Sequence, residues 1–131
     1  MKKIALAVAL SAAAVSAHAN WSPLDSSPAD PKLYVNHETA EKSVSRMVLL
    51  WHVIDHKEAQ SRDGKEFRSQ MLRYEYDCDK SMYREMFRSW HKGAMASGMT
   101  VYWTEGQRQW LAPEPGSLDE VLTRASCAGM K

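Results

Sequence analysis

The chain has no excess of charge of either sign. Its 131 residues include 17 basic and 16 acidic side chains, which gives a formal net charge of +1. Removal of Lys2 and Lys3 with an amino-terminal leader would leave 15 basic residues and a net charge of −1. Proteins that bind nucleic acid or anionic membranes through their surface usually carry a clear basic excess. The composition therefore argues against nucleic-acid binding and against polybasic docking on a membrane.

Catalytic motifs and long apolar runs are missing beyond the first 19 residues. There is no G-x-S-x-G serine, no C-x-x-C pair and no glycine-rich phosphate loop. Asp77 and Asp79 lie close in sequence, but they flank a predicted turn, where aspartate is favoured without any catalytic role. No segment of the mature chain is apolar enough to span a membrane. We therefore expect a protein that is not an enzyme and holds no cofactor.

Cysteine is scarce, since Cys78 and Cys127 are the only two in the chain. An even number of cysteines in an exported protein predicts a disulfide, and two cysteines allow only one pairing. Such a bond closes a loop of about 50 residues, for which the chain-entropy treatment gives about 4 kcal/mol. Two free thiols are the alternative.

The amino terminus carries the pattern of a secretory signal. Two lysines precede an apolar run at residues 4–10, and residues 17–19 form an A-x-A cleavage site. We therefore expect residues 1–19 to be a signal peptide and residues 20–131 to be a single domain. Asn20, not cysteine, follows the cleavage site, so we expect a periplasmic or secreted protein without a lipid anchor. An uncleaved amino-terminal anchor is the alternative.

The rest of the chain alternates between strand patterns and turns. The predicted strands are residues 33–36, 44–54, 67–78, 82–91 and 99–105. The run 44–54 has apolar residues at both its odd and its even positions, and therefore on both faces of a strand. This is typical of a central strand covered on both faces. Residues 82–91 also fit a helix, because Met82, Met86 and Trp90 suit either periodicity; a strand is favoured because a short turn precedes it.

Two polar segments are predicted to connect these strands. Residues 37–42 have the composition of a turn. Residues 56–66 are predicted to be a charged connection that contains the turn signal Asp63-Gly64. Trp110, in an irregular segment farther along, is expected to anchor that segment in the core.

The last segment predicts the only helix. Ser117 and Glu120 form an S-x-x-E capping box after Pro-Gly. The apolar stripe that follows consists of Leu118, Val121, Leu122 and Ala125. We expect the helix to end near residues 125–126, so that Cys127 turns back to Cys78. The predicted fold class is α+β: one antiparallel sheet of five to six strands, one carboxy-terminal helix packed on it, and one disulfide.

A cluster of cations indicates a partner-binding segment. It comprises Lys57, Arg62, Lys65 and Arg68. A loop that holds these residues on a rigid sheet is suited to an acidic partner, because rigid scaffolds commonly present binding residues on loops. On sequence alone, a solvated charged loop without a partner is the favoured interpretation of these residues, and they are kept as a candidate partner-binding segment.

Metal binding is a weaker hypothesis. His52 and His56 are four residues apart, which on a strand places them about 13 Å apart and prevents shared coordination. Thioethers and imidazole suit Cu(I) or Ag(I), and the relevant residues are Met82, Met86, Trp90, His91, Met95 and Met99. The favoured explanation is that Met82 and Met86 fill gaps in the core and that Met95 and Met99 lie on a loop. We expect no metal site; a soluble periplasmic protein that binds a small ligand, haem or a soft metal is the alternative function.

Several motifs together resemble the surface-adhesin protein E family of Gram-negative bacteria. The matching segments are "LYVN" at 33–36, "VLLWHVID" at 48–55, "GKEFRSQMLRYEYDCDKSMYR" at 64–84 and "PGSLDEVLTRASC" at 115–127, with Trp21 and Trp110. The resemblance implies an antiparallel sheet crossed by a carboxy-terminal helix and closed by a Cys78–Cys127 disulfide. It also implies a non-enzymatic role in binding host matrix glycoproteins such as vitronectin and laminin.

Export makes a direct prediction about mass. The purified mature protein should begin at Asn20 and carry no acyl chain, because the A-x-A site ends at residue 19 and no cysteine follows it. Intact-mass spectrometry measures both features. A retained Met1, or the added mass of a lipid, would contradict the prediction.

Overall fold

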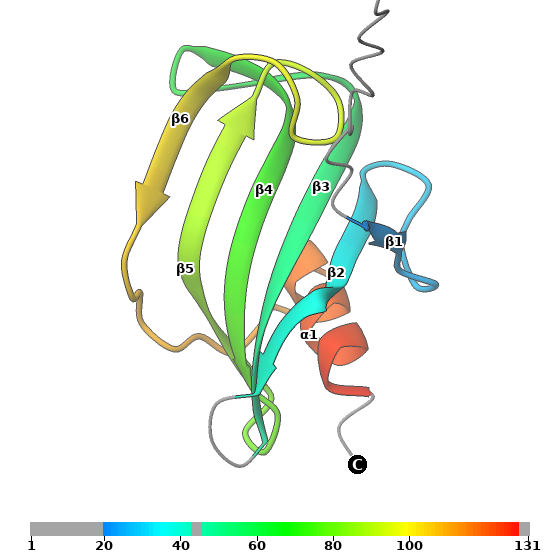
Figure 1. Cartoon of the computed structure of the whole chain (residues 1–131), viewed down its shortest axis with the longest axis vertical. Helices are drawn as coiled ribbons and strands as arrows, with labels where there is room; N and C mark the ends of the chain where they lie inside the picture. Colours follow the sequence, from blue (N-terminus) through cyan, green and yellow to red (C-terminus); the bar gives the residue numbers. More distant parts are fainter. Residues whose placement is uncertain (1–19, 43–45, 129–131) are drawn as a thin grey trace, which may run out of the picture.

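The computed structural model describes residues 20–42 and 46–128, and within them it contains one sheet and one helix. The elements are β1 (Ser22–Pro23), β2 (Lys32–Lys42), β3 (Met47–Arg62), β4 (Lys65–Asp77), β5 (Met82–His91), β6 (Thr100–Glu105) and α1 (Leu118–Ala128). The strands lie in the order of the sequence and every neighbouring pair is antiparallel. Figure 1 shows α1 packed across one face of this sheet. The predicted α+β class is confirmed.

The longest hairpin joins β3 and β4 through two residues. Asp63 and Gly64 both have positive φ, 52° and 73°, and Arg62 pairs with Lys65 across the turn. This is the arrangement of a type I′ turn, whose twist matches that of the strands it joins. The turn signal is confirmed, but the charged connection predicted at 56–66 is wrong. Its residues extend both strands, because exposed charged side chains are compatible with strand ends that protrude beyond the core.

A second correction concerns residues 37–42, which were expected to form a turn. They continue β2, although the pairing with β3 shifts register between Asn36 and Glu41. Polar residues are tolerated at this position because the ladder is interrupted there. The first residues of the strand predicted at 44–54, Val44 and Ser45, lie outside the described residues.

β3 also differs from the expectation that both of its faces are covered. Val48, Leu50 and Ile54 are buried on the side of α1, whereas on the opposite side Val53 is fully buried but Met47, Leu49 and Trp51 are only half-buried. The reason is that the helix covers one face of the sheet. We call the opposite face, which carries Trp51, the open face. Residues 82–91 form a strand, as favoured over a helix.

α1 packs by the predicted stripe. Leu122 is fully buried, and Leu118 and Val121 pack against the core beside it. The other core side chains come from the strands and include Leu33, Val35, Leu72, Tyr74 and Tyr76. Tyr74 and Tyr76 supply large buried areas, which suits a core that one short helix must complete.

The start of α1 has half of the expected capping box. The Glu120 N–H donates to Ser117 Oγ at 3.2 Å, as predicted. The Glu120 carboxylate accepts from the Gly116 N–H at 3.4 Å instead of the Ser117 N–H, which donates to the Glu114 carbonyl. Gly116 has a φ of +80°, a conformation that glycine adopts without strain.

The end of α1 lies beyond the expected position. The helix continues to Ala128 and includes Cys127, so it does not unwind at residues 125–126. Cys127 is nevertheless bonded to Cys78, with 5.4 Å between their Cα atoms. No unwinding is needed because Cys78 follows β4 directly at the end of the sheet, beneath the last helical turn.

Loss of the disulfide should destabilise the helix more than the sheet. We expect the double variant Cys78→Ser/Cys127→Ser to lose about 2–5 kcal/mol of unfolding free energy. Amide exchange should rise most in residues 118–125, because α1 then keeps only its apolar contacts. Chemical denaturation and hydrogen exchange measure the two effects. An unchanged unfolding free energy, or faster exchange spread evenly over the chain, would contradict this account.

Candidate functional site

The described residues contain no group of three His, Cys, Asp or Glu side chains that could hold a metal ion. Among the helices in that part of the chain, none has the length and apolar character needed to cross a membrane. The search for a functional site therefore turns to surfaces that combine exposed aromatic rings with charged side chains.

The tip of the β3–β4 hairpin folds back onto β5 and β6. The Arg62 guanidinium carbon lies 5.8 Å from the centroid of the Trp90 ring, and Lys65 Nζ lies 6.0 Å from that of Tyr102. The two rings are themselves 4.5 Å apart, and Phe67 stacks on Trp90 at 4.6 Å. In Figure 1 the hairpin tip bends across the top of the sheet toward β6. Cation–π contacts therefore orient two of the predicted cations.

The other two predicted cations lie elsewhere on the hairpin. The Lys57 backbone N–H donates to the Asp30 carboxylate at 3.0 Å, which fixes the main chain and not the ammonium group, whereas the Arg68 side chain donates from Nε to the His56 carbonyl at 3.2 Å. All four cationic side chains are exposed. The structure thus brings Arg62 and Lys65 together beside β5 and β6, while Lys57 and Arg68 lie on the part of the hairpin nearer β2.

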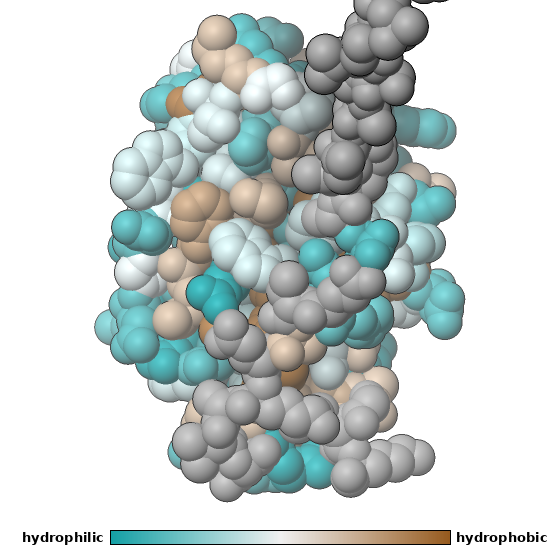
Figure 2. Space-filling model, in the orientation of Figure 1, coloured by the Kyte–Doolittle hydropathy of each residue, from teal (hydrophilic) through white to brown (hydrophobic). Residues whose placement is uncertain are grey.

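The open face carries an aromatic cluster that the sequence reasoning missed. Trp51 and Phe87 meet edge to face with 5.4 Å between ring centroids, and the Arg73 guanidinium lies 5.4 Å from the Trp51 ring. Figure 2 shows apolar side chains gathered over the central strands of this face. The strand pairing brings the cluster together, since Arg73 pairs with Trp51 on one side and with Phe87 on the other. The register shift between Asp55 and Gln60 prevents this pairing from being counted out from the turn in the sequence.

A shallow hollow of about 680 Å³ lies beside this cluster. Trp51, Arg73 and Phe87 line it, together with Met86, Glu105 and Gln107. Arginine and tryptophan are enriched among the residues that dominate binding energy at protein interfaces. The open face therefore has the composition of a docking surface. We refer to Trp51, Arg73 and Phe87 as the open-face cluster.

A second cation–π contact lies on the open face near the other end of β5. Arg84 donates to the Glu75 carboxylate from Nε at 2.8 Å, and its second terminal nitrogen lies 2.6 Å from the same oxygen. Its guanidinium carbon is 4.5 Å from the Trp110 ring centroid. Trp110, expected in the core, is instead half-buried beneath this arginine.

Hydrogen bonds tie α1 to β4 and β5 on the helix side. The hydroxyls of Tyr74 and Tyr83 donate to the two Asp119 oxygens at 3.0 and 2.8 Å, and Arg88 donates to the Tyr74 hydroxyl at 2.7 Å. Burial raises the pKa of both tyrosines. These phenols therefore stay protonated and serve as donors, so the cluster holds the helix in place and is not set up for acid–base chemistry.

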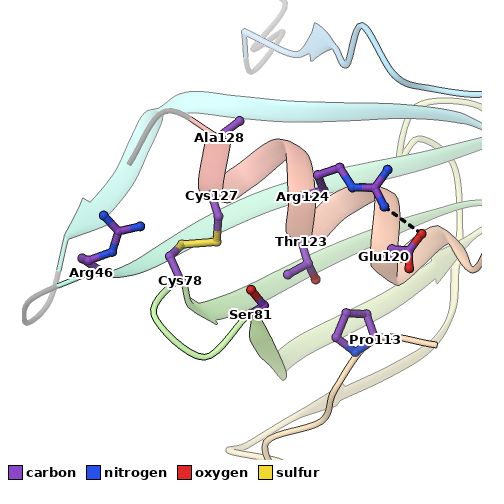
Figure 3. Close-up of a pocket in the computed structure, with 9 residues that line it drawn as sticks. All are labelled: Arg46, Cys78, Ser81, Pro113, Glu120, Thr123, Arg124, Cys127 and Ala128. Atoms are coloured by element: carbon purple, nitrogen blue, oxygen red, sulfur yellow. Dashed lines mark hydrogen bonds and ion pairs between the residues drawn. A yellow bond between two sulfur atoms is a disulfide. The ribbon is translucent and has the colours of Figure 1, made fainter. Parts of the chain in front are cut away.

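Figure 3 shows a further hollow, of about 490 Å³, around the disulfide. Arg46 and Arg124 line it, but Arg46 is paired with Asp79 at 2.6 Å and Arg124 with Glu120 at 3.0 Å. Since both arginines that line the hollow are in ion pairs, it is less suited to an anion than their charges suggest.

The ring of His91, within the methionine-rich region, is hydrogen-bonded through both of its nitrogens. The His91 ring bonds to Ser89 at 2.7 Å and to Thr100 at 3.3 Å. Met82 and Met86 lie on β5, and Met99 is 67 % exposed in the loop before β6.

His52 is buried in the core and bonded through both ring nitrogens. Nδ1 lies 3.1 Å from the Tyr34 carbonyl, to which it donates, and Nε2 then accepts from the Tyr76 hydroxyl at 2.6 Å. Burial lowers the pKa of His52 to about 4, although the bond to Tyr34 opposes this. His56 instead bonds to Gln70 at 3.2 Å, so the two histidines share no ligand role.

Comparison with known proteins identifies the class. The family of surface-adhesin protein E matches residues 21–128. Since this is most of the chain, the protein belongs to that family. None of the curated proteins compared with the chain matches it. Membership defines an exported, adhesin-like surface protein.

Solved structures of Haemophilus influenzae protein E share the fold. One is 13% identical to this chain with a TM-score of 0.59, and the alignment covers 83% of this chain and 84% of the protein E chain. A crystal form II structure is 13% identical with a TM-score of 0.57 and covers 74% and 80%, respectively. Protein E from a non-typeable strain is 12% identical with a TM-score of 0.59 and covers 82% and 75%. At these identities the likeness shows the fold alone.

The environment of His52 predicts a pH-dependent stability. Its folded pKa of about 4 lies below the value of 6.5 for an exposed histidine, so folding disfavours the protonated ring. The stabilisation is full above pH 6.5 and is lost as the pH falls toward 4, a loss of about 3 kcal/mol.

Denaturation at several pH values measures this loss. The variant His52→Gln should show a shallower decrease between pH 7 and pH 4, whatever its stability at pH 7. Equal pH dependence in the variant and the unmodified protein would show that His52 is not the group responsible.

Proposed function

We propose that this protein is a non-enzymatic adhesin that binds host matrix glycoproteins, with vitronectin and laminin as the first partners to test. The observation that supports the proposal best is the open-face cluster, which places Trp51, Arg73 and Phe87 side by side on the face of the sheet opposite α1. We further propose that the mature protein is periplasmic or secreted and has no lipid anchor.

The chemistry of the open-face cluster and that of the cationic hairpin both favour a protein partner. Aromatic rings with an arginine stacked on them can be desolvated at modest cost, because the guanidinium is weakly hydrated. A rigid sheet also loses little conformational entropy when it binds. The exposed cations Lys57, Arg62, Lys65 and Arg68 are proposed to add contacts with acidic groups and to speed association with an acidic partner.

Binding of the mature protein to immobilised vitronectin and laminin tests the proposal. We expect Trp51→Ala to weaken binding by about tenfold or more, as for a central aromatic contact, and Trp51→Phe to restore part of the loss. Arg62→Glu should reduce the association rate and its salt dependence. The control Lys80→Glu changes an exposed cation at the opposite end of β4 and should leave binding unchanged.

Two results would contradict this function. The first is the absence of binding to any matrix glycoprotein by folded mature protein. The second is equal binding by the Trp51→Ala variant, provided that its melting temperature shows that it is folded. Proteolysis of the intact source cells gives an independent check, because an adhesin must be accessible from outside the cell.

A further inference from the structure

The two edges of the sheet differ in how well they are protected. At one edge stands β1, which has two residues and includes Pro23. At the other stands β6, whose sequence TVYWTE contains no proline and, apart from Glu105 at its end, no charged residue. In the part of the chain that the structure describes, β6 pairs only with β5. Natural proteins usually block such an edge with charge, proline or a covering segment. Figure 1 shows β6 at the outer border of the sheet, with β5 on its inner side and no described strand on its outer side.

The register identifies the backbone groups that point outward from β6. The Gly106 N–H donates to the Met86 carbonyl at 3.0 Å, and Glu105 is the residue that pairs with Phe87. In an antiparallel ladder the hydrogen-bonded residues alternate. Tyr102 and Thr104 therefore direct their N–H and C=O groups toward β5, and Trp103 and Glu105 direct theirs away from the sheet. A pairing shift near Val101 limits this regular edge to residues 102–105.

Exposed apolar side chains follow the same edge. Within residues 20–42 and 46–128 the exposed large hydrophobic side chains are Met99 at 67%, Trp103 at 62% and Leu111 at 46%. Met99 directly precedes β6. Leu111 lies farther along the same segment, where it exchanges backbone hydrogen bonds of 2.8 and 3.0 Å with Tyr83 of β5. Exposed apolar residues along an unpaired edge are typical of a site that receives another strand.

Cations lie on the other side of this edge. Trp103 pairs with Ser89 on the open face, whereas Tyr102 and Thr104 pair with Trp90 and Arg88 on the helix side. Lys65 Nζ is 6.0 Å from the centroid of the Tyr102 ring, and Arg108 donates to the Thr104 hydroxyl at 2.8 Å. A strand placed beside β6 would thus face positive charge on one side and the Trp103 ring on the other.

We infer that the β6 edge binds an extended segment of a partner protein in which acidic and apolar residues alternate. The backbone of that segment would pair with Trp103 and Glu105. Its acidic side chains would face Lys65 and Arg108, and its apolar side chains would pack on Trp103. The inference rests on the proposed function in that it takes the partner to be a protein. It adds the conformation and residue pattern that the partner presents.

The probe is a capped ten-residue peptide in which glutamate and valine alternate. A peptide of the same composition, with the valines and glutamates in two blocks, controls for charge and hydrophobicity. We expect the alternating peptide to bind the mature protein at least about tenfold more tightly, because only it places all glutamates on one side of a strand. Binding is measured by fluorescence anisotropy, and amide exchange by NMR should slow at Trp103 and Glu105.

Variants separate the backbone contribution from the charge contribution. Glu105→Pro removes one outward N–H while keeping the bonds to β5, and it should weaken peptide binding about three- to tenfold. Lys65→Glu should weaken it by a similar factor, and the control Lys80→Glu should not. Trp103→Ala tests the apolar contact without a backbone change, so the inference can be tested even if the proline variant fails to fold.

The outcomes are distinct. Equal affinity for the two peptides, or unchanged amide exchange at Trp103 and Glu105, would overturn the inference. Protection of these amides in a dimer without peptide would also overturn it, because the occupant would then be a second copy of the chain. If Glu105→Pro and Trp103→Ala bind matrix glycoproteins normally, the proposed function stands and the edge site is wrong. If no glycoprotein binds but the alternating peptide does, the proposed function fails and the edge site stands.

Discussion

The structure depends on the burial of one face of a six-stranded sheet by a single helix of eleven residues. A helix this short is marginal on its own in water, so α1 requires both its apolar stripe and its covalent bond to Cys78. Polar contacts add to this, because Asp119 accepts from the hydroxyls of Tyr74 and Tyr83 on two different strands. The helix is thus fixed at its first turn by hydrogen bonds and at its last turn by the disulfide.

The same constraint determines which surfaces remain exposed. The only described helix covers one face, so the opposite face retains the open-face cluster in contact with solvent. The sheet also extends beyond the core, where the tip of the β3–β4 hairpin bends over Trp90 and Tyr102. The elements that stabilise the fold lie on the helix side, while aromatic rings that remain partly exposed and the predicted cations lie on the open face, the hairpin tip and the β6 edge. This separation permits binding residues to vary with little effect on stability.

Local signals in the sequence predicted much of this fold. The alternation in residues 67–78, the Asp63-Gly64 turn and the S-x-x-E cap each depend on neighbours in the chain, and the structure contains the first two and the Ser117 half of the cap. Features that depend on distant contacts were missed. Whether Trp51 is covered depends on which face receives α1, and no periodicity within β3 reports that. The predicted cations are on the hairpin, but the position of Lys65 beside Tyr102 results from a bend in the strands and a register shift between Asp55 and Gln60. Residues 37–42 were predicted to be a turn because their composition is polar, but they continue β2.

Oxidative footprinting of the free and the glycoprotein-bound protein tests the central claim most directly, because hydroxyl radicals label exposed tryptophan, phenylalanine and methionine side chains. The account predicts that binding protects Trp51 and Phe87 on the open face, and Trp103 and Met99 along the β6 edge, while labelling of the helix side stays the same. Protection confined to α1 and the hollow around Cys78 and Cys127, with Trp51 and Trp103 labelled as in the free protein, would contradict the account.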